Sequence, residues 1–179
     1  YPQFDGLNLT FETREGILKH CSRAHAEQLE AAEPGGVGQR FLLRRQPSLE
    51  AQLCNLADAI AYNAHDIDDG VRSGLLTLAQ LRALPLFDRY RAEAEAEHPQ
   101  LGTASGQRRL LYEAIRRMLS AQVYDVINAT SAAIAQAAPD HVDAVRAAPP
   151  LVCFSSAMHA ESQQLKRFLM DNLYHHPQV

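Results

Sequence analysis

The stretch from Leu56 to Gly70 reads LADAIAYNAHDIDDG, which places polar side chains within an otherwise apolar helical pattern. At about 100° per residue, Asp58, Tyr62 and Asp66 fall within an arc of roughly 80° on one helix face, with His65 inside or beside it. Two carboxylates and a phenol, each one turn from the next, can contact a single ligand or metal ion. The alternative is a solvated helix face with acidic residues near its end.

The residues around this face favour a helix that is largely buried in a larger domain. Leu53, Leu56, Ile60 and Ala61 supply apolar positions beside the polar ones. Aspartate is a poor helix former in the middle of a helix, because its side chain competes for backbone hydrogen bonds. A carboxylate such as Asp58 therefore needs a reason to be there, and ligand binding is one.

The composition fits one globular domain, or a large piece of one. The chain has 179 residues, a formal net charge of −4 and 46% hydrophobic residues. It lacks an apolar run of about 18 residues, so a membrane-spanning helix is not expected. The start, YPQFD, does not have the pattern of a signal peptide, and both ends look cut. Cys21, Cys54 and Cys153 lie far apart, which predicts reduced, buried thiols in a cytosolic protein.

Hydrophobic spacing and capping signals predict an all-α chain. The expected elements are a segment capped by Thr10 and running through Ile17 and Leu18 towards Leu29; a loop over 31–38; a helix that starts at Pro47 and ends near Gly70 and Gly74; a short helix with a capping box at Thr77–Gln80; a helix end and loop over 92–106; a long helix over 107–137; a short helical segment from Pro139 to Pro149-Pro150; an extended run over 151–154; and a last helix from Ser155 or Ser156 to His175.

Four phrases in a fixed order carry a resemblance to a known family. They are DGLNLTFET at 5–13, EGILKH at 15–20, QPSLEAQ at 46–52 and AYNAHDIDDG at 61–70. With them the chain closely resembles the deoxyguanosine triphosphate triphosphohydrolase-like proteins, a bacterial branch of the HD-domain phosphohydrolases. The likeness continues through RRM at 116–118 and LKRFL at 165–169, so it covers essentially the whole chain.

The resemblance implies a fold, a reaction and a metal ligand. The fold would be the C-terminal helical part of an HD-domain-like phosphohydrolase, with residues 1–179 as a single helical unit. In it, 1–76 would end the HD-type core and 77–179 would form the C-terminal helical region. The family hydrolyses deoxynucleoside triphosphates (dNTPs) to nucleoside and tripolyphosphate at a metal held by a His, a His-Asp pair and a distant Asp. Asp58 matches the distant Asp, and Tyr62 and Asp66 would face the triphosphate and the sugar.

The chain departs from the family pattern in two places. Ala59 stands where the family usually has a second acidic residue. The upstream His and the His-Asp pair should precede Tyr1, and His65-Asp66 belongs to the Tyr-x-x-x-Asp pattern instead. We therefore expect this chain to supply one of the four ligands of a divalent metal, Mg or Mn, and to be inactive alone. Such a metal would lower the pKa of bound water and polarise a phosphoryl oxygen.

Arginines on the predicted long helix suggest a further substrate contact. Arg109 and Arg116 lie two turns apart on nearly the same side, which suits a clamp for a polyphosphate. An exposed basic stripe paired with Glu113 or Asp125 is an equal alternative for each.

The favoured reading is thus part of a metal-dependent dNTP triphosphohydrolase of the cytoplasm. Its partners would be a dNTP, further copies of the chain in a homo-oligomer, and a nucleic acid or a dNTP as effector, without a membrane. The alternative is a non-catalytic helical module for oligomerisation or effector binding.

Overall fold

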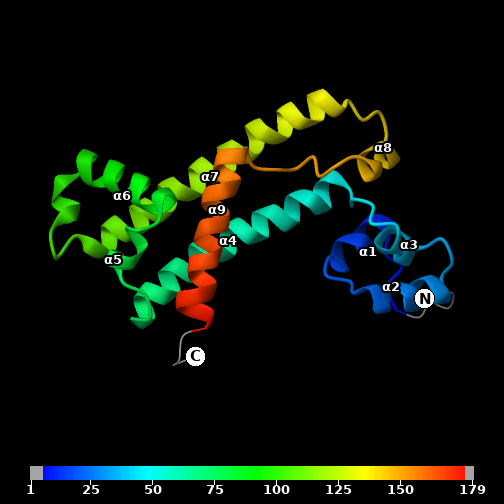
Figure 1. Cartoon of the computed structure of the whole chain (residues 1–179), viewed down its shortest axis with the longest axis horizontal. Helices are drawn as coiled ribbons and strands as arrows, with labels where there is room; N and C mark the ends of the chain where they lie inside the picture. Colours follow the sequence, from blue (N-terminus) through cyan, green and yellow to red (C-terminus); the bar gives the residue numbers. More distant parts are fainter. Residues whose placement is uncertain (1–5, 176–179) are drawn as a thin grey trace. The chain divides into compact units, whose positions relative to one another are not determined.

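The computed structural model describes residues 6–175, and every regular element in this range is a helix (Figure 1). The all-α prediction is therefore confirmed. The elements are α1 (Phe11–Ile17), α2 (Arg23–Ala32), α3 (Val37–Leu42), α4 (Leu49–Ser73), α5 (Leu78–Leu81), α6 (Pro85–Glu97), the 3-10 turn η1 (Pro99–Gly102), α7 (Gln107–Ala137), α8 (Val142–Ala147), α9 (Ser156–Leu169) and the π-helical turn η2 (Met170–Tyr174). None of the helices within 6–175 is long and apolar enough to cross a membrane. The predictions about the two ends concern residues 1–5 and 176–179, which lie outside the described range.

The chain divides into two compact units. The first comprises Tyr1–Leu56 and Ser131–Cys153, and the second Ala57–Thr130 and Phe154–Val179. The long helices α4 and α7 each pass from one unit into the other. Residues 76 and 77 both belong to the second unit, and the division expected there, between an HD-type core and a C-terminal region, stays a prediction.

The first unit is organised around a buried carboxylate. Glu15 of α1 is fully buried and accepts a hydrogen bond from the backbone N–H of Ser48 at 2.9 Å. Its carboxylate also pairs with Arg40 of α3 (Nε to Oε2, 3.3 Å) and Arg146 of α8 (Nη2 to Oε1, 3.7 Å). Burial lowers the pKa of Arg40, the charge of Glu15 acts in the opposite direction, and the charge of Arg146 lowers that pKa further. One side chain thus connects α1, α3, α8 and the start of α4.

The second unit has an apolar core built from five helices. Its buried members come from the C-terminal half of α4, from the α5–α6 region, and from α7 and α9; they are Ala64, Ile67, Leu76, Leu81, Leu84, Leu86, Phe87, Leu111, Ala114, Ile115, Met118, Met158, Leu165 and Leu169. Gln122 is a fully buried polar residue of this unit, and its side-chain amide N–H donates to Ser162 Oγ at 3.1 Å. This core fixes the part of α4 that carries the polar face.

The segment expected to run from Thr10 towards Leu29 is two helices. Thr10 does cap α1, as predicted, but α1 ends at Ile17 and Ser22 caps a separate helix, with its Oγ accepting from His25 N–H. The predicted loop over 31–38 is also shorter, because α3 begins at Val37. The sequence pattern missed these breaks because both helices keep apolar residues on similar spacing.

Helix α4 begins two residues later than predicted and is less buried than expected. Ser48 Oγ accepts from Ala51 N–H, so the first turn comes after Ser48 and not at Pro47. Leu53 is 50% exposed and Ala61 is exposed, which corrects the prediction of a largely buried helix, whereas Ile60 is buried. The cysteine prediction is corrected in part: the three cysteines are reduced, as predicted, but Cys54 is exposed and Cys21 and Cys153 are half-buried.

The later elements agree with the prediction apart from small changes. Helix α7 has the predicted bounds, Thr77 forms the predicted capping box of α5, and Ser155 caps α9. The stripe of α7 is narrower than predicted near its end, since Val126 is buried but Val123 and Ile127 are 44% and 52% exposed. The short segment expected from Pro139 is α8, which starts at Val142. The predicted extended run over 151–154 belongs to neither a helix nor a strand, and the N–H groups of Leu151 and Val152 donate to the amide oxygen of buried Gln52.

Candidate functional site

The polar face of α4 lies on the second unit and is opposite its buried side. Ile60, Ala64 and Ile67 turn into the core and hold the helix in place. Asp58, Tyr62 and Asp66 occur at intervals of four residues, so they share one face. Tyr62 is 60% exposed, whereas both aspartates are half-buried. The face therefore offers two carboxylates and a phenol that solvent or a ligand can reach.

The structure adds a residue that the sequence pattern did not single out. The Tyr174 hydroxyl, from η2, donates a hydrogen bond of 2.6 Å to Asp66 Oδ2. This hydrogen bond, partial burial, and the charges of Asp66 and Tyr62 raise the pKa of Tyr174 to about 12. An aromatic residue at the end of the predicted last helix was the only signal in the sequence. The two partners are 108 positions apart in the sequence, which explains why spacing could not reveal the contact.

Tyr174 reaches Asp66 because α9 is fixed along its length. Asp125 accepts hydrogen bonds from the backbone N–H and Oγ of Ser155 at 2.8 and 2.6 Å, which ties the first turn of α9 to α7. Leu165 and Leu169 are buried in the core. Beyond them the chain forms the π-helical turn η2, in which His175 N–H donates to Met170 O, a geometry that is frequent at functional sites.

The two candidate arginines lie on α7 of the same unit and are both exposed. Arg116 donates two hydrogen bonds to Glu113, at 2.9 and 2.7 Å, and Arg117 donates to Glu113 at 2.8 Å and to Glu97 at 2.5 Å. These bonds from Arg116 and Arg117 lower the pKa of Glu113 to about 2. Pairing with Glu113, one of the alternatives for Arg116, is thus present, whereas Arg109 has no such carboxylate partner among the described contacts.

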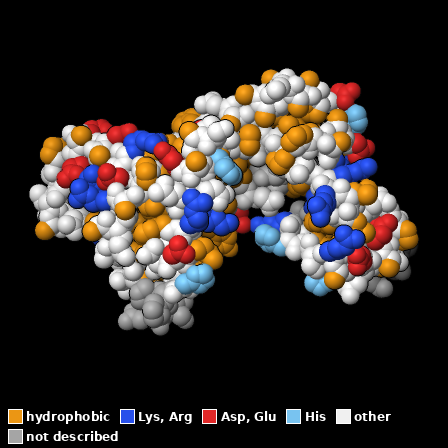
Figure 2. All heavy atoms as spheres, in the orientation of Figure 1, with side chains coloured by type: hydrophobic (Ala, Val, Ile, Leu, Met, Phe, Trp, Pro, Cys, Tyr) orange, Lys and Arg blue, Asp and Glu red, His pale blue; other side chains and the backbone are white. Residues whose placement is uncertain are grey.

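Ion pairs of this kind are common on the second unit. Figure 2 shows acidic and basic side chains next to one another on the surface that carries α6. Within α6, Arg91 pairs with Asp88 at 2.6 Å and with Glu95, and Arg89 pairs with Glu161 of α9. Most arginines here already have a carboxylate, so charge alone does not mark a phosphate site.

A metal ion would need more ligands than this face supplies. Within residues 6–175 no three His, Cys, Asp or Glu side chains are grouped so that they could hold a metal. Asp58 could contribute one carboxylate oxygen, which binds a divalent ion weakly without partners. Residues 6–175 do not by themselves fit a metal centre.

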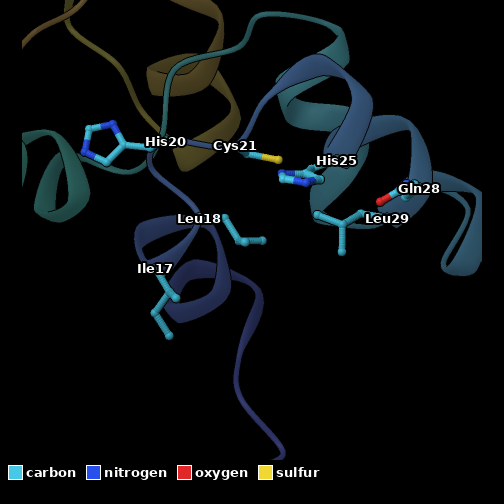
Figure 3. Close-up of a pocket in the computed structure, with 7 residues that line it drawn as sticks. All are labelled: Ile17, Leu18, His20, Cys21, His25, Gln28 and Leu29. Atoms are coloured by element: carbon cyan, nitrogen blue, oxygen red, sulfur yellow. The ribbon is translucent and has the colours of Figure 1, made fainter.

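A cavity of about 440 Å³ lies in the first unit, between the end of α1 and α2 (Figure 3). Figure 3 shows the Cys21 side chain directed towards His25, while His20 points away. The lining residues are Ile17, Leu18, His20, Cys21, His25, Gln28 and Leu29. A second cavity, of about 520 Å³ in the second unit, is lined by Asp68, Val71, Arg72, Leu78, Ala104, Gln107, Arg108, Leu111 and Tyr112.

Comparison with known proteins identifies relatives of this chain. The chain is 60% identical to the deoxyguanosinetriphosphate triphosphohydrolase-like protein of Ralstonia nicotianae over 176 residues, which are 98% of this chain and 43% of the relative. Proteins of the same name are 54% identical in Bordetella pertussis and 47% identical in Nitrosomonas europaea, each over the whole chain and over 44% and 46% of the relative. None of the family models searched matches the chain.

The chain therefore matches a portion of the deoxyguanosinetriphosphate triphosphohydrolase-like proteins, which confirms the resemblance seen in the sequence. It spans less than half the length of the curated relatives that it matches.

Proposed function

We propose that this chain forms part of a metal-dependent dNTP triphosphohydrolase that acts on dGTP or a similar nucleotide. The products would be the deoxynucleoside and tripolyphosphate. The observation that carries the proposal is the sequence identity of up to 60% to relatives with this name. The polar face of α4, which a buried core holds in place, supports it.

The proposed roles rest on the chemistry of each side chain. Asp58 would supply one oxygen to a Mg or Mn ion, whose other ligands come from residues outside this chain. When bound, that ion supplies positive charge at the phosphates and activates water. Tyr62, exposed and one turn on, would contact the triphosphate through its hydroxyl. Asp66 would accept a hydrogen bond from the sugar, because an ionised carboxylate can only accept.

The arginines would neutralise the remaining phosphate charge. Arg109 is exposed and available, and a guanidinium binds phosphate oxygens through two parallel N–H donors. Arg116 would have to exchange Glu113 for the substrate. Because Glu113 keeps Arg117 as a partner, this exchange does not leave its carboxylate unpaired. We further propose a homo-oligomer in the cytoplasm, with a nucleic acid or a dNTP as effector.

The alternative is a non-catalytic helical module that uses the same helices for assembly or effector binding. The exposed apolar side chains of α7, Val123 and Ile127, favour this role. Such a module would not bind manganese and would not hydrolyse nucleotides.

Phosphorus NMR of the longest natural polypeptide that contains this chain would test the proposal. The protein is incubated with Mn and each of the four dNTPs, and tripolyphosphate is the expected product. Asp58→Asn should reduce turnover at least 100-fold, an effect typical of a lost metal ligand or its support. Asp69→Asn is the matched control, because Asp69 lies on the same helix but is exposed and paired with Arg72. No tripolyphosphate from the wild-type protein, or equal loss in both variants, would refute the assignment.

A further inference from the structure

We propose that Tyr174 is a positioning residue: its hydroxyl orients the Asp66 carboxylate and thereby sets the selectivity of the site for the nucleotide sugar. This inference rests on the proposed function, since it takes Asp66 as the sugar contact. Tyr174 itself need not touch the nucleotide. Its role is to decide in which direction the free oxygen of Asp66 points.

The first observation is the geometry of the contact. The hydroxyl donates to Oδ2 at 2.6 Å, a short distance typical of a hydrogen bond to an ionised carboxylate. With Oδ2 occupied, Oδ1 of Asp66 is left to accept from a ligand. A half-buried carboxylate without this bond would rotate about its last side-chain torsion, which is broad in aspartate. The contact therefore selects one orientation out of several.

The second observation is the way η2 presents the tyrosine. A π turn holds one residue more per hydrogen-bonded turn than an α-helix, so it rotates the residues after it by about 100° relative to α-helical continuation. Asn172 Nδ2 donates to Phe168 O at 2.9 Å and so ties this turn to the last turn of α9. Leu173 packs against the core of the second unit. The π turn thus sets the direction of Tyr174. The Asn172 hydrogen bond and the packing of Leu173 hold the turn itself in place.

The third observation is that Tyr62 lies one helical turn before Asp66 on the same face of α4. Tyr174 reaches this face from η2, which is distant in sequence. A ligand hydroxyl that enters there meets an acceptor whose orientation is already fixed, so less ordering is needed on binding.

The test compares two nucleotides in the longest natural polypeptide that contains this chain. dGTP carries the 3′-hydroxyl and 2′,3′-dideoxyguanosine triphosphate lacks it, so the ratio of their kcat/KM values reports the sugar contact. Tyr174→Phe keeps the ring and its packing but removes the hydroxyl. We expect the ratio to fall about tenfold, mainly through a higher KM for dGTP, because a charge-assisted hydrogen bond that orients the acceptor is lost.

Two further variants and one control complete the comparison. Asp66→Asn should abolish the preference, and Asn172→Ala, which loosens the π turn, should lower it as Tyr174→Phe does. Tyr112→Phe is the matched control, because the Tyr112 hydroxyl is bound to Arg108 and has no contact with Asp66. An unchanged ratio in Tyr174→Phe, together with a reduced ratio in Asp66→Asn, would overturn the proposal and leave the proposed function intact.

A measurement that does not depend on catalysis tests the positioning contact separately from the proposed function. In the same natural polypeptide, labelled with ¹³C at the tyrosine Cζ and without nucleotide, the Tyr174 resonance should shift in Asp66→Asn and not in Asp69→Asn. Failure of this shift would refute the positioning contact, whatever the activity. Absence of dGTP hydrolysis by the wild-type protein would instead refute the proposed function.

Discussion

Replacing Glu15 by glutamine should destabilise the first unit by an amount that the structure allows us to estimate. The change keeps the shape of the side chain and leaves a carbonyl oxygen that can accept from Ser48 N–H. It removes the negative charge between Arg40 and Arg146, whose side chains are only 8% and 11% exposed. Loss of one partner from a buried ion pair costs about 3–5 kcal/mol, because the remaining charge stays desolvated.

The lower end of that range applies here. Arg146 keeps Glu12, at 3.2 Å, and Asp143, at 3.1 Å, as partners after the substitution. Arg40 keeps only its hydrogen bond to the carbonyl of Arg45 at 2.7 Å and its stacking on Phe41. We therefore expect a loss of about 3 kcal/mol, or about two orders of magnitude in the opening equilibrium.

Hydrogen exchange followed by mass spectrometry is the suitable assay, since it resolves local opening within each unit. Peptides from α1, α3 and the start of α4 should exchange about 100-fold faster in Glu15→Gln, while peptides from α6 should be unaffected. Glu27→Gln is the matched control: Glu27 lies in the same unit, but its pair with Arg23 is exposed and is worth at most about 0.5 kcal/mol. Equal exchange in the two variants would refute the claim that Glu15 organises the unit.

Three further predictions concern the second unit. Gly70→Ala should lower Tm and the free energy of unfolding by ~1 kcal/mol, because the new Cβ would lie 2.5 Å from Leu76 Cδ1. This clash should outweigh the better helix propensity of alanine, and an unchanged or higher Tm would contradict the prediction. Met118→Ala should cost about 2–5 kcal/mol in urea unfolding, as Met118 is fully buried, and a loss below 1 kcal/mol would show that the core collapses around it. Because the folded pKa of Tyr174 is raised to about 12, its bond to Asp66 should stabilise the chain below pH 10, and this contribution should disappear between about pH 10 and 12. Tyr174→Phe should remove this alkaline step from a stability–pH curve, and a curve that keeps it would assign the step elsewhere.

Local signals in the sequence were sufficient where neighbouring residues decide the structure. The capping box at Thr77 and the Ser155 cap depend on side chains within a few residues of the backbone groups that they satisfy, and the bounds of α7 follow from local helical periodicity. The break between α1 and α2 was missed although Ser22 is a good cap, because a continuous apolar stripe outweighed a single capping residue in the prediction. The start of α4 was also predicted two residues too early, because Pro47 was taken as its first residue and the cap formed by Ser48 was overlooked.

What the sequence by itself determined is the all-helical class, the common face of Asp58, Tyr62 and Asp66, and the family, since helical periodicity and ordered phrases are properties of the chain alone. Only the tertiary structure decided which side of α4 is buried, that Cys54 is exposed, and that Glu15 and Tyr174 have their partners. The physical reason is sequence separation. A carboxylate meets an arginine or a phenol more than 100 residues away only because separate helices pack together, and no local pattern records that packing.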